Sequence, residues 1–157
     1  MSNDKHGLST PAQVEALADQ LSACADELHA RLMTEAAAIG AMPDGSAARA
    51  TRRAAADRMC DAEQELRQRA NSLYADTAAA IVATLGEPQQ QVIELTQAAA
   101  RRIRRITLIS DATGLVAGLL ALAGGVASAQ PGAVLTALET IRTQLKAVKA
   151  GRPAKPP

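Results

Sequence analysis

Apolar residues in the first forty positions recur at alternating steps of three and four. This spacing is typical of a helix that buries one narrow seam, and it predicts a helix over residues 11–39. Thr10, Pro11 and Gln13 mark its start, because a hydroxyl caps the first turn, a glutamine completes a capping box and proline suits the first helical turn. The seam consists of Val14, Leu17, Leu21, Cys24 and Leu28.

A seven-residue apolar repeat follows a turn-rich loop at 40–46. Its members are Met59, Leu66, Leu73 and Ala80. The repeat predicts a second helix over 47–85, between a capping Ser46 and the helix-ending Gly86. At 1.5 Å per residue this helix would be ~58 Å long. The two helices would therefore form an elongated antiparallel hairpin over 11–87.

The rest of the chain predicts one long helix and one short helix. The long helix begins near Pro88, is amphipathic up to Ile106, and continues through the apolar segment 112–129. A Gln-Pro-Gly break at 130–132 separates it from a short amphipathic helix over 133–149. The apolar positions are Val92, Leu95, Ala99 and Ile103 in the long helix and Val134, Leu138, Ile141, Leu145 and Val148 in the short one.

These elements predict an all-α fold, an elongated antiparallel helical hairpin or coiled-coil bundle of about four helices, one of them apolar and Gly-rich. The chain of 157 residues has no Phe or Trp and a single Tyr. Its core must consist of aliphatic side chains and alanine, which suit helix packing better than sheets. The expected organisation is a flexible N-terminal tail (1–10), the hairpin (11–87), the apolar and C-terminal helices (88–150) and a Pro-rich tail (151–157).

The segment 112–129 contains no charged residue and presents two different stripes on a helix. The small stripe is Gly114, Gly118, Ala121, Gly125 and Ser128, and the large stripe is Leu115, Leu119, Leu122 and Val126. A small stripe allows another helix to approach closely. Because each glycine in a water-exposed helix costs about 1 kcal/mol relative to alanine, the glycines indicate helix–helix or membrane contact.

Three interpretations of this segment stay open. As a transmembrane helix, its 18 residues would span ~27 Å of a ~30 Å hydrocarbon core. A basic collar would then lie at the cytoplasmic interface; it consists of Arg101, Arg102, Arg104 and Arg105. As part of a soluble hairpin, the segment would turn its large stripe toward helix 133–149 and leave its small stripe free to receive helix 47–85 or another subunit. In the third interpretation, a soluble form releases the segment into a membrane.

Charge is distributed unevenly between the two parts of the chain. Residues 1–100 carry 8 basic and 14 acidic residues, whereas residues 101–157 carry 9 and 2. The two parts could attract each other within one molecule or between subunits, or the basic part could bind anionic lipid. For the collar, ion pairs with Asp61, Glu63 or Glu65 are an alternative to lipid. The lack of aromatic residues for base stacking disfavours nucleic acid as a partner.

The two cysteines are the only candidates for a chemical role. A hairpin that turns at residue 43 would bring Cys24 and Cys60 to nearly the same level. They form either a candidate redox pair or two small buried hydrophobic residues. No histidine–cysteine cluster has metal-ligand spacing, and no phosphate-binding loop follows a strand. We therefore expect no cofactor, no metal and no enzymatic activity.

The N-terminal sequence has no apolar stretch, so we expect no standard secretory signal. A cytoplasmic or membrane-associated location is predicted, and signal-less secretion is compatible with the sequence. The leading functional hypothesis is a non-enzymatic helical assembly component that self-associates or packs on a helical partner through its Gly-rich helix. The alternatives are a membrane-inserting protein, such as a pore former, secretion-system translocator or membrane-anchored scaffold, and a helical adaptor or chaperone that covers a partner's apolar helix.

Overall fold

The computed structural model describes residues 7–77, 80, 82, 85 and 87–149, with side chains up to residue 147. In these residues the chain forms five α-helices, one short 3₁₀ helix and no strand. The all-α class predicted from the sequence is therefore confirmed. The elements are α1 (Pro11–Gly40), α2 (Ala47–Ala75), α3 (Gln89–Arg105), η2 (Ile109–Ala112), α4 (Thr113–Ala127) and α5 (Pro131–Lys149).

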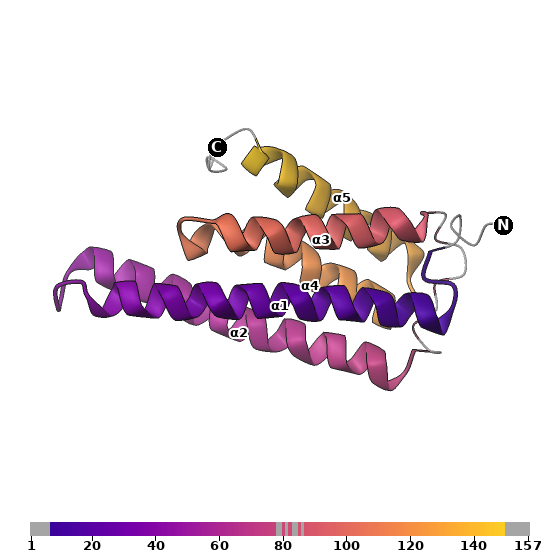
Figure 1. Ribbon diagram of the computed structural model, residues 1–157, viewed down its shortest axis with the longest axis horizontal. Coiled ribbons are helices and arrows are strands. Elements are labelled where there is room, and N and C mark those ends of the chain that lie inside the picture. Colours follow the sequence, from indigo (N-terminus) through magenta and orange to yellow (C-terminus); the bar gives the residue numbers. More distant parts are fainter. Residues whose placement is uncertain (1–6, 78–79, 81, 83–84, 86, 150–157) are drawn as a thin grey trace.

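The long hairpin of α1 and α2 supports the other three helices (Figure 1). Helix α3 packs along α1, α4 packs on both α2 and α5, and α5 also contacts α3. Because α1 has 30 residues and α3 has 17, the loop end of the hairpin extends beyond the end of α3 (Figure 1). Helix α4 lies between α2 of the hairpin and α5.

Both helices of the hairpin start where the sequence predicts. The Thr10 hydroxyl accepts a hydrogen bond from the Gln13 amide at 3.2 Å, and the Ser46 hydroxyl accepts one from the Arg49 amide at 3.1 Å. These bonds satisfy amides that a helix cannot pair internally. All five residues predicted for the α1 seam are buried. Hydroxyl caps and heptad spacing depend only on neighbouring residues, which explains why the sequence alone predicts these helix starts and the buried seam of α1.

The predicted end of the second helix is wrong, because α2 stops at Ala75 rather than at residue 85. The following segment instead pairs with residues near the N-terminus. The Val82 amide donates to the Leu8 carbonyl, and the Gly7 amide donates to the Glu87 carbonyl, each at 2.8 Å. Leu8 is completely buried. Residues 7–10 are therefore not part of a loose tail, while residues 1–6 and the predicted tail 151–157 lie outside the described residues.

The predicted long helix through the apolar segment is also wrong, because the chain breaks between α3 and α4. Helix α3 ends at Arg105, and Ile106 adopts an extended conformation with φ −66° and ψ 147°. The 3₁₀ helix η2 follows, and α4 then runs back alongside α2 (Figure 1). Ile106 and Ile109 are both buried. The apolar spacing continues across the turn and therefore gives no sign of it. As a result, the described residues form five helices, where the sequence predicted about four.

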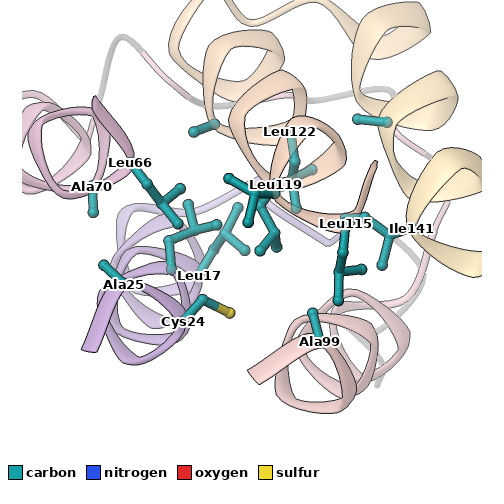
Figure 2. Close-up of a cluster of buried hydrophobic side chains, with 14 of the residues drawn as sticks. Leu17, Cys24, Ala25, Leu66, Ala70, Ala99, Leu115, Leu119, Leu122 and Ile141 are labelled. Carbon is teal, nitrogen blue, oxygen red and sulfur yellow. The ribbon is translucent and has the colours of Figure 1, made fainter. Parts of the chain in front are cut away.

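The main core forms where α4 meets the hairpin. Leu119 and Leu122 of α4 lie close to Leu17 of α1 and Leu66 of α2 (Figure 2). Farther along α4, Leu115 lies next to Ile141 of α5 (Figure 2). All six side chains are buried. The core thus consists of interdigitating aliphatic residues, which bury apolar area without aromatic rings.

Candidate helix-contact surface

The large stripe of α4 faces the interior of the protein. Its four members are buried. Leu119 and Leu122 lie toward the hairpin, whereas Leu115 lies beside Ile141 of α5 (Figure 2). The sequence predicted that the C-terminal helix covers this stripe. That prediction holds only at Leu115, because α4 folds back beside α2 and turns Leu119 and Leu122 toward the hairpin.

The small stripe of α4 is occupied by α5. A Cβ atom added at Gly118 would lie 2.9 Å from Ile141 Cγ1, and one added at Gly125 would lie 3.1 Å from the Val134 nitrogen. One added at Gly114 would overlap the Gln144 side chain. The prediction that this stripe stays free for another subunit is therefore wrong for its glycines. They let α5 approach α4 at a distance that side chains would prevent.

A third side of α4 is exposed and lacks charge. Ala117 and Ala121 are exposed, and Leu120 and Gly124 are half-buried; these four residues are called the α4 face below. Ala121 is the one small-stripe member that belongs to it, while Ser128, also exposed, lies just beyond the end of α4. The outer side of a surface helix is normally polar. An uncharged outer side composed of small residues suits close contact with a further helix.

An ion pair of α2 lies at one edge of the α4 face. A Cβ atom at Gly124 would lie 2.7 Å from Arg69 Nη1, so the guanidinium rests against the bare glycine backbone. Glu65 holds this guanidinium through hydrogen bonds of 3.0 Å from Nε and 2.7 Å from Nη2. This contact was not predicted from the sequence. The spacing of Glu65 and Arg69 predicts their pairing within one helix, but no local signal shows that Arg69 reaches α4.

The arginine collar at the end of α3 is only partly paired. Arg104 Nη2 donates to Glu27 Oε2 of α1 at 2.6 Å, and this hydrogen bond raises the pKa of Arg104. Arg101 and Arg105 are exposed and Arg102 is half-buried. Within the described residues, the ion pairs of the collar involve Arg104 alone.

The prediction that the collar forms ion pairs with acidic residues of α2 is wrong. Glu63 instead accepts from Arg67, and Glu65 accepts from Arg69, each pair being four residues apart on α2. Asp61 is exposed and forms no ion pair with the collar. The reason is topological: α3 packs on α1 rather than on α2, so Glu27 is the carboxylate that the collar meets.

The two cysteines are free and lie in different surroundings. Cys24 is buried, and its thiol donates to the Thr96 carbonyl of α3 at 3.3 Å. Burial, with a smaller contribution from the negative charge of Glu27, raises the pKa of Cys24 to about 12. Cys60 is exposed on α2. The candidate redox pair is therefore not bridged in this structure, and Cys24 is held as an unreactive thiol.

An ion pair between a half-buried arginine and a buried glutamate, near the loop of the hairpin, was also not predicted. Arg52 of α2 donates from Nε and Nη2 to both carboxylate oxygens of Glu35 of α1, at 2.9 and 2.8 Å. Glu35 is only 5% exposed. Both residues are nearly equidistant from the turn at residue 43, so the hairpin register could have predicted this pair.

The described residues contain no group of three or more histidine, cysteine or acidic side chains that could hold a metal ion. His29 is exposed on α1, and His6 lies outside the described residues.

The segment Ile109–Ala127, with 19 residues and a mean hydropathy of 1.6, is long and apolar enough to cross a membrane; 56% of its most apolar window is buried inside the protein. Comparison with known families, characterised proteins and solved structures finds no match.

Proposed function

We propose that the protein is a non-enzymatic helical assembly component that self-associates by packing the α4 face on the same face of a second copy. The observation that carries this proposal is the composition of α4, which has no charged residue although one of its sides is exposed. A helix that is apolar all round is normally covered on every side. The hairpin covers one side of α4 and α5 another, which leaves the α4 face for a partner helix.

A second copy is a suitable partner for geometric and electrostatic reasons. A two-fold axis brings identical patches together, and the alanines and glycine of the α4 face permit close helix contact. The ion pair at its edge places a carboxylate, Glu65, beside a guanidinium, Arg69. A two-fold partner can therefore offer an opposite charge to each of them. Such pairing would fix the register of two faces that otherwise lack directional contacts.

The oligomeric state of the full-length protein tests this proposal. Light scattering at increasing protein concentration should show a dimer, because a two-fold contact closes with two copies. Ala121→Glu should reduce it to a monomer, because two like charges would meet inside a packed interface. The matched control is Ala54→Glu, an exposed alanine of α2, which should leave the mass unchanged. A wild-type protein that stays monomeric, or an Ala121→Glu protein with unchanged mass, would contradict the proposal.

Membrane insertion is the second candidate function, and the span Ile109–Ala127 favours it. Its 19 residues would extend ~28 Å as a helix, close to the ~30 Å thickness of a bilayer core. Helix α5, held by the glycines of α4, could enter with it as a hairpin. In this alternative the bundle is a form that exists before insertion.

Flotation with lipid vesicles separates the two candidates. An inserting protein should float with the vesicles and remain bound in high salt, whereas Ala121→Glu, with a charge within the span, should float less. A charge at the centre of a bilayer costs roughly 2.5–3.5 kcal/mol. Full-length protein that remains in the soluble fraction as a defined oligomer would refute insertion and support the assembly function.

A further inference from the structure

The arginine collar at the end of α3 takes no part in the proposed self-association. Its four arginines stand within the last five residues of the helix. Arg104 is paired with Glu27 of α1 at 2.6 Å, and within the described residues this is the only ion pair of the collar. Arg101 and Arg105 are exposed, and Arg102 is half-buried. Three guanidinium groups can therefore meet an anionic partner without first breaking an ion pair.

The position of the collar at a helix end accounts for only part of this charge. The C-terminus of a helix carries a partial negative charge of about half an elementary charge, which nearby basic residues offset. Glu27 offsets a further unit of the collar, and the exposed Asp111 of η2 is the next acidic residue along the chain. Four guanidinium groups exceed these negative charges together, so the collar remains positive.

The turn that follows the collar presents an apolar side chain to the solvent. Leu108 is 43% exposed, whereas Ile106 and Ile109 on either side of it are buried. The Leu108 backbone is extended, with φ −110° and ψ 138°, and its carbonyl accepts a hydrogen bond of 2.9 Å from the Asp111 amide. The two buried isoleucines therefore fix the turn and leave Leu108 at its surface, three residues after Arg105.

A single exposed leucine is common on protein surfaces, but this one directly follows a cluster of unpaired arginines. Attachment to a bilayer surface has the same two components. Basic residues are attracted to anionic headgroups, and an apolar side chain enters the boundary between headgroups and acyl chains. Clusters of about four to eight basic residues are typical of such sites. We propose that the collar and Leu108 together form a peripheral binding site for an anionic lipid surface.

This site acts on the folded bundle, which distinguishes it from membrane insertion. Insertion requires α4 to leave the core that it forms with the hairpin, whereas the collar and Leu108 are accessible as they stand. Lipid also fits these residues better than nucleic acid does. The chain has no Phe or Trp and one Tyr for stacking on bases, and an apolar Leu108 gains nothing from a phosphate backbone.

Tryptophan fluorescence tests the contact on the full-length protein, because the chain contains no Trp. Leu108→Trp places a single reporter at the turn. Its emission should shift to shorter wavelength when vesicles of phosphatidylcholine and phosphatidylglycerol are added, and should not shift with phosphatidylcholine alone. The shift should reverse in high salt, which screens the arginines.

The matched control for this reporter is Met33→Trp, at a position of α1 that is 62% exposed. Met33 is nine residues, or about two and a half helical turns, from Cys24. Because Cys24 contacts Thr96 of α3, Met33 lies on the side of α1 that faces away from α3. Emission from the Met33→Trp protein should therefore stay unchanged with the same vesicles.

Flotation with the mixed vesicles measures the contribution of each component. Arg105→Gln should weaken binding about fivefold, which is the effect of one basic residue near an anionic surface. Leu108→Ser should weaken it roughly tenfold, because an apolar side chain no longer leaves water. The matched control for charge is Arg53→Gln, an exposed arginine of α2, which should leave binding unchanged.

Several results would overturn the proposal. They are the absence of binding to the mixed vesicles, equal binding by wild-type, Arg105→Gln and Leu108→Ser proteins, and an equal loss with Arg53→Gln. An emission shift of the Leu108→Trp protein that persists in high salt would also overturn it and indicate insertion. Binding of single-stranded DNA without binding of vesicles would assign the collar to nucleic acid instead. All these variants leave the α4 face unchanged, so their results do not depend on the proposed self-association.

Discussion

Gly125 of α4 lies directly against the backbone of Val134 in α5. A Cβ atom at Gly125 would be 3.1 Å from the Val134 nitrogen and 3.2 Å from the Ala133 carbonyl carbon. The turn between the helices is closed by a hydrogen bond of 3.0 Å from the Gln130 amide to the Gly125 carbonyl, with Ala129 in the left-handed region at φ 53°. Gly125 therefore contributes both to the turn and to the close helix contact.

We expect Gly125→Ala to destabilise the protein by about 1–3 kcal/mol, because the new methyl group meets backbone atoms that cannot rotate away. Gly124→Ala is the matched control on the same helix. There the methyl group would meet only the end of the Arg69 side chain, and alanine should add up to ~1 kcal/mol through its higher helix propensity. Urea denaturation followed by circular dichroism measures both. Equal effects at the two positions would contradict the close α4–α5 contact.

The two thiols should differ strongly in reactivity. In native protein at mildly alkaline pH, a thiol reagent should rapidly modify Cys60, which is exposed, and leave Cys24 protected. Cys24 should react only after denaturation, because its thiol is buried and protonated. Two fast thiols would show that the α1–α3 contact opens easily, and the loss of both under oxidising conditions would restore the redox-pair hypothesis.

Cys24 should also make stability depend on pH in the alkaline range. Its pKa is about 12 in the folded protein, against a reference value of 9.0. Above pH 9 the unfolded chain loses this proton while the folded chain keeps it, so the free energy of unfolding falls as pH rises. By pH 10 the loss should reach ~1.4 kcal/mol relative to Cys24→Ala. Parallel urea titrations of both proteins measure it, and identical pH profiles would contradict the prediction.

The Glu35–Arg52 ion pair should contribute more to the stability of the fold than the exposed ion pairs do. Arg52→Met leaves the buried Glu35 carboxylate without its bidentate partner, and an uncompensated buried charge is strongly destabilising. Arg69→Met, which breaks the exposed pair with Glu65, should have a smaller effect on the midpoint of urea denaturation. Replacing Glu35 and Arg52 together by leucine should recover much of the loss. A double variant no more stable than Arg52→Met would refute this explanation.

The sequence predicted the elements with local signals and missed those set by distant contacts. The caps at Thr10 and Ser46 and the buried seam of α1 follow from neighbouring residues. The end of α2 at Ala75 depends on backbone pairing with residues 7–8. That pairing joins segments more than seventy positions apart, so no window of sequence contains it.

The residues of the two α4 stripes were recognisable from the sequence, but their partners were not. Helical spacing correctly grouped the leucines that are buried in the core. Their assignment to the C-terminal helix holds only for Leu115, because the break after Arg105 reverses the chain and turns Leu119 and Leu122 toward the hairpin. The apolar spacing conceals this break, since Ile103 before it and Ile106 and Ile109 after it are all buried. The α4 face could not be predicted from the sequence, because its exposure depends on which sides of α4 the hairpin and α5 cover.

Disulfide trapping across the α4 face tests the central claim most directly. In a Cys60→Ser background, Ala121→Cys should form a covalent dimer under mild oxidation, because a two-fold contact brings the two copies of this position together. Ala54→Cys, at a position that is also exposed but lies on α2, should remain monomeric on a non-reducing gel. A dimer specific to Ala121→Cys is the predicted result. Equal cross-linking of both variants, or none at Ala121→Cys, would contradict assembly through this face.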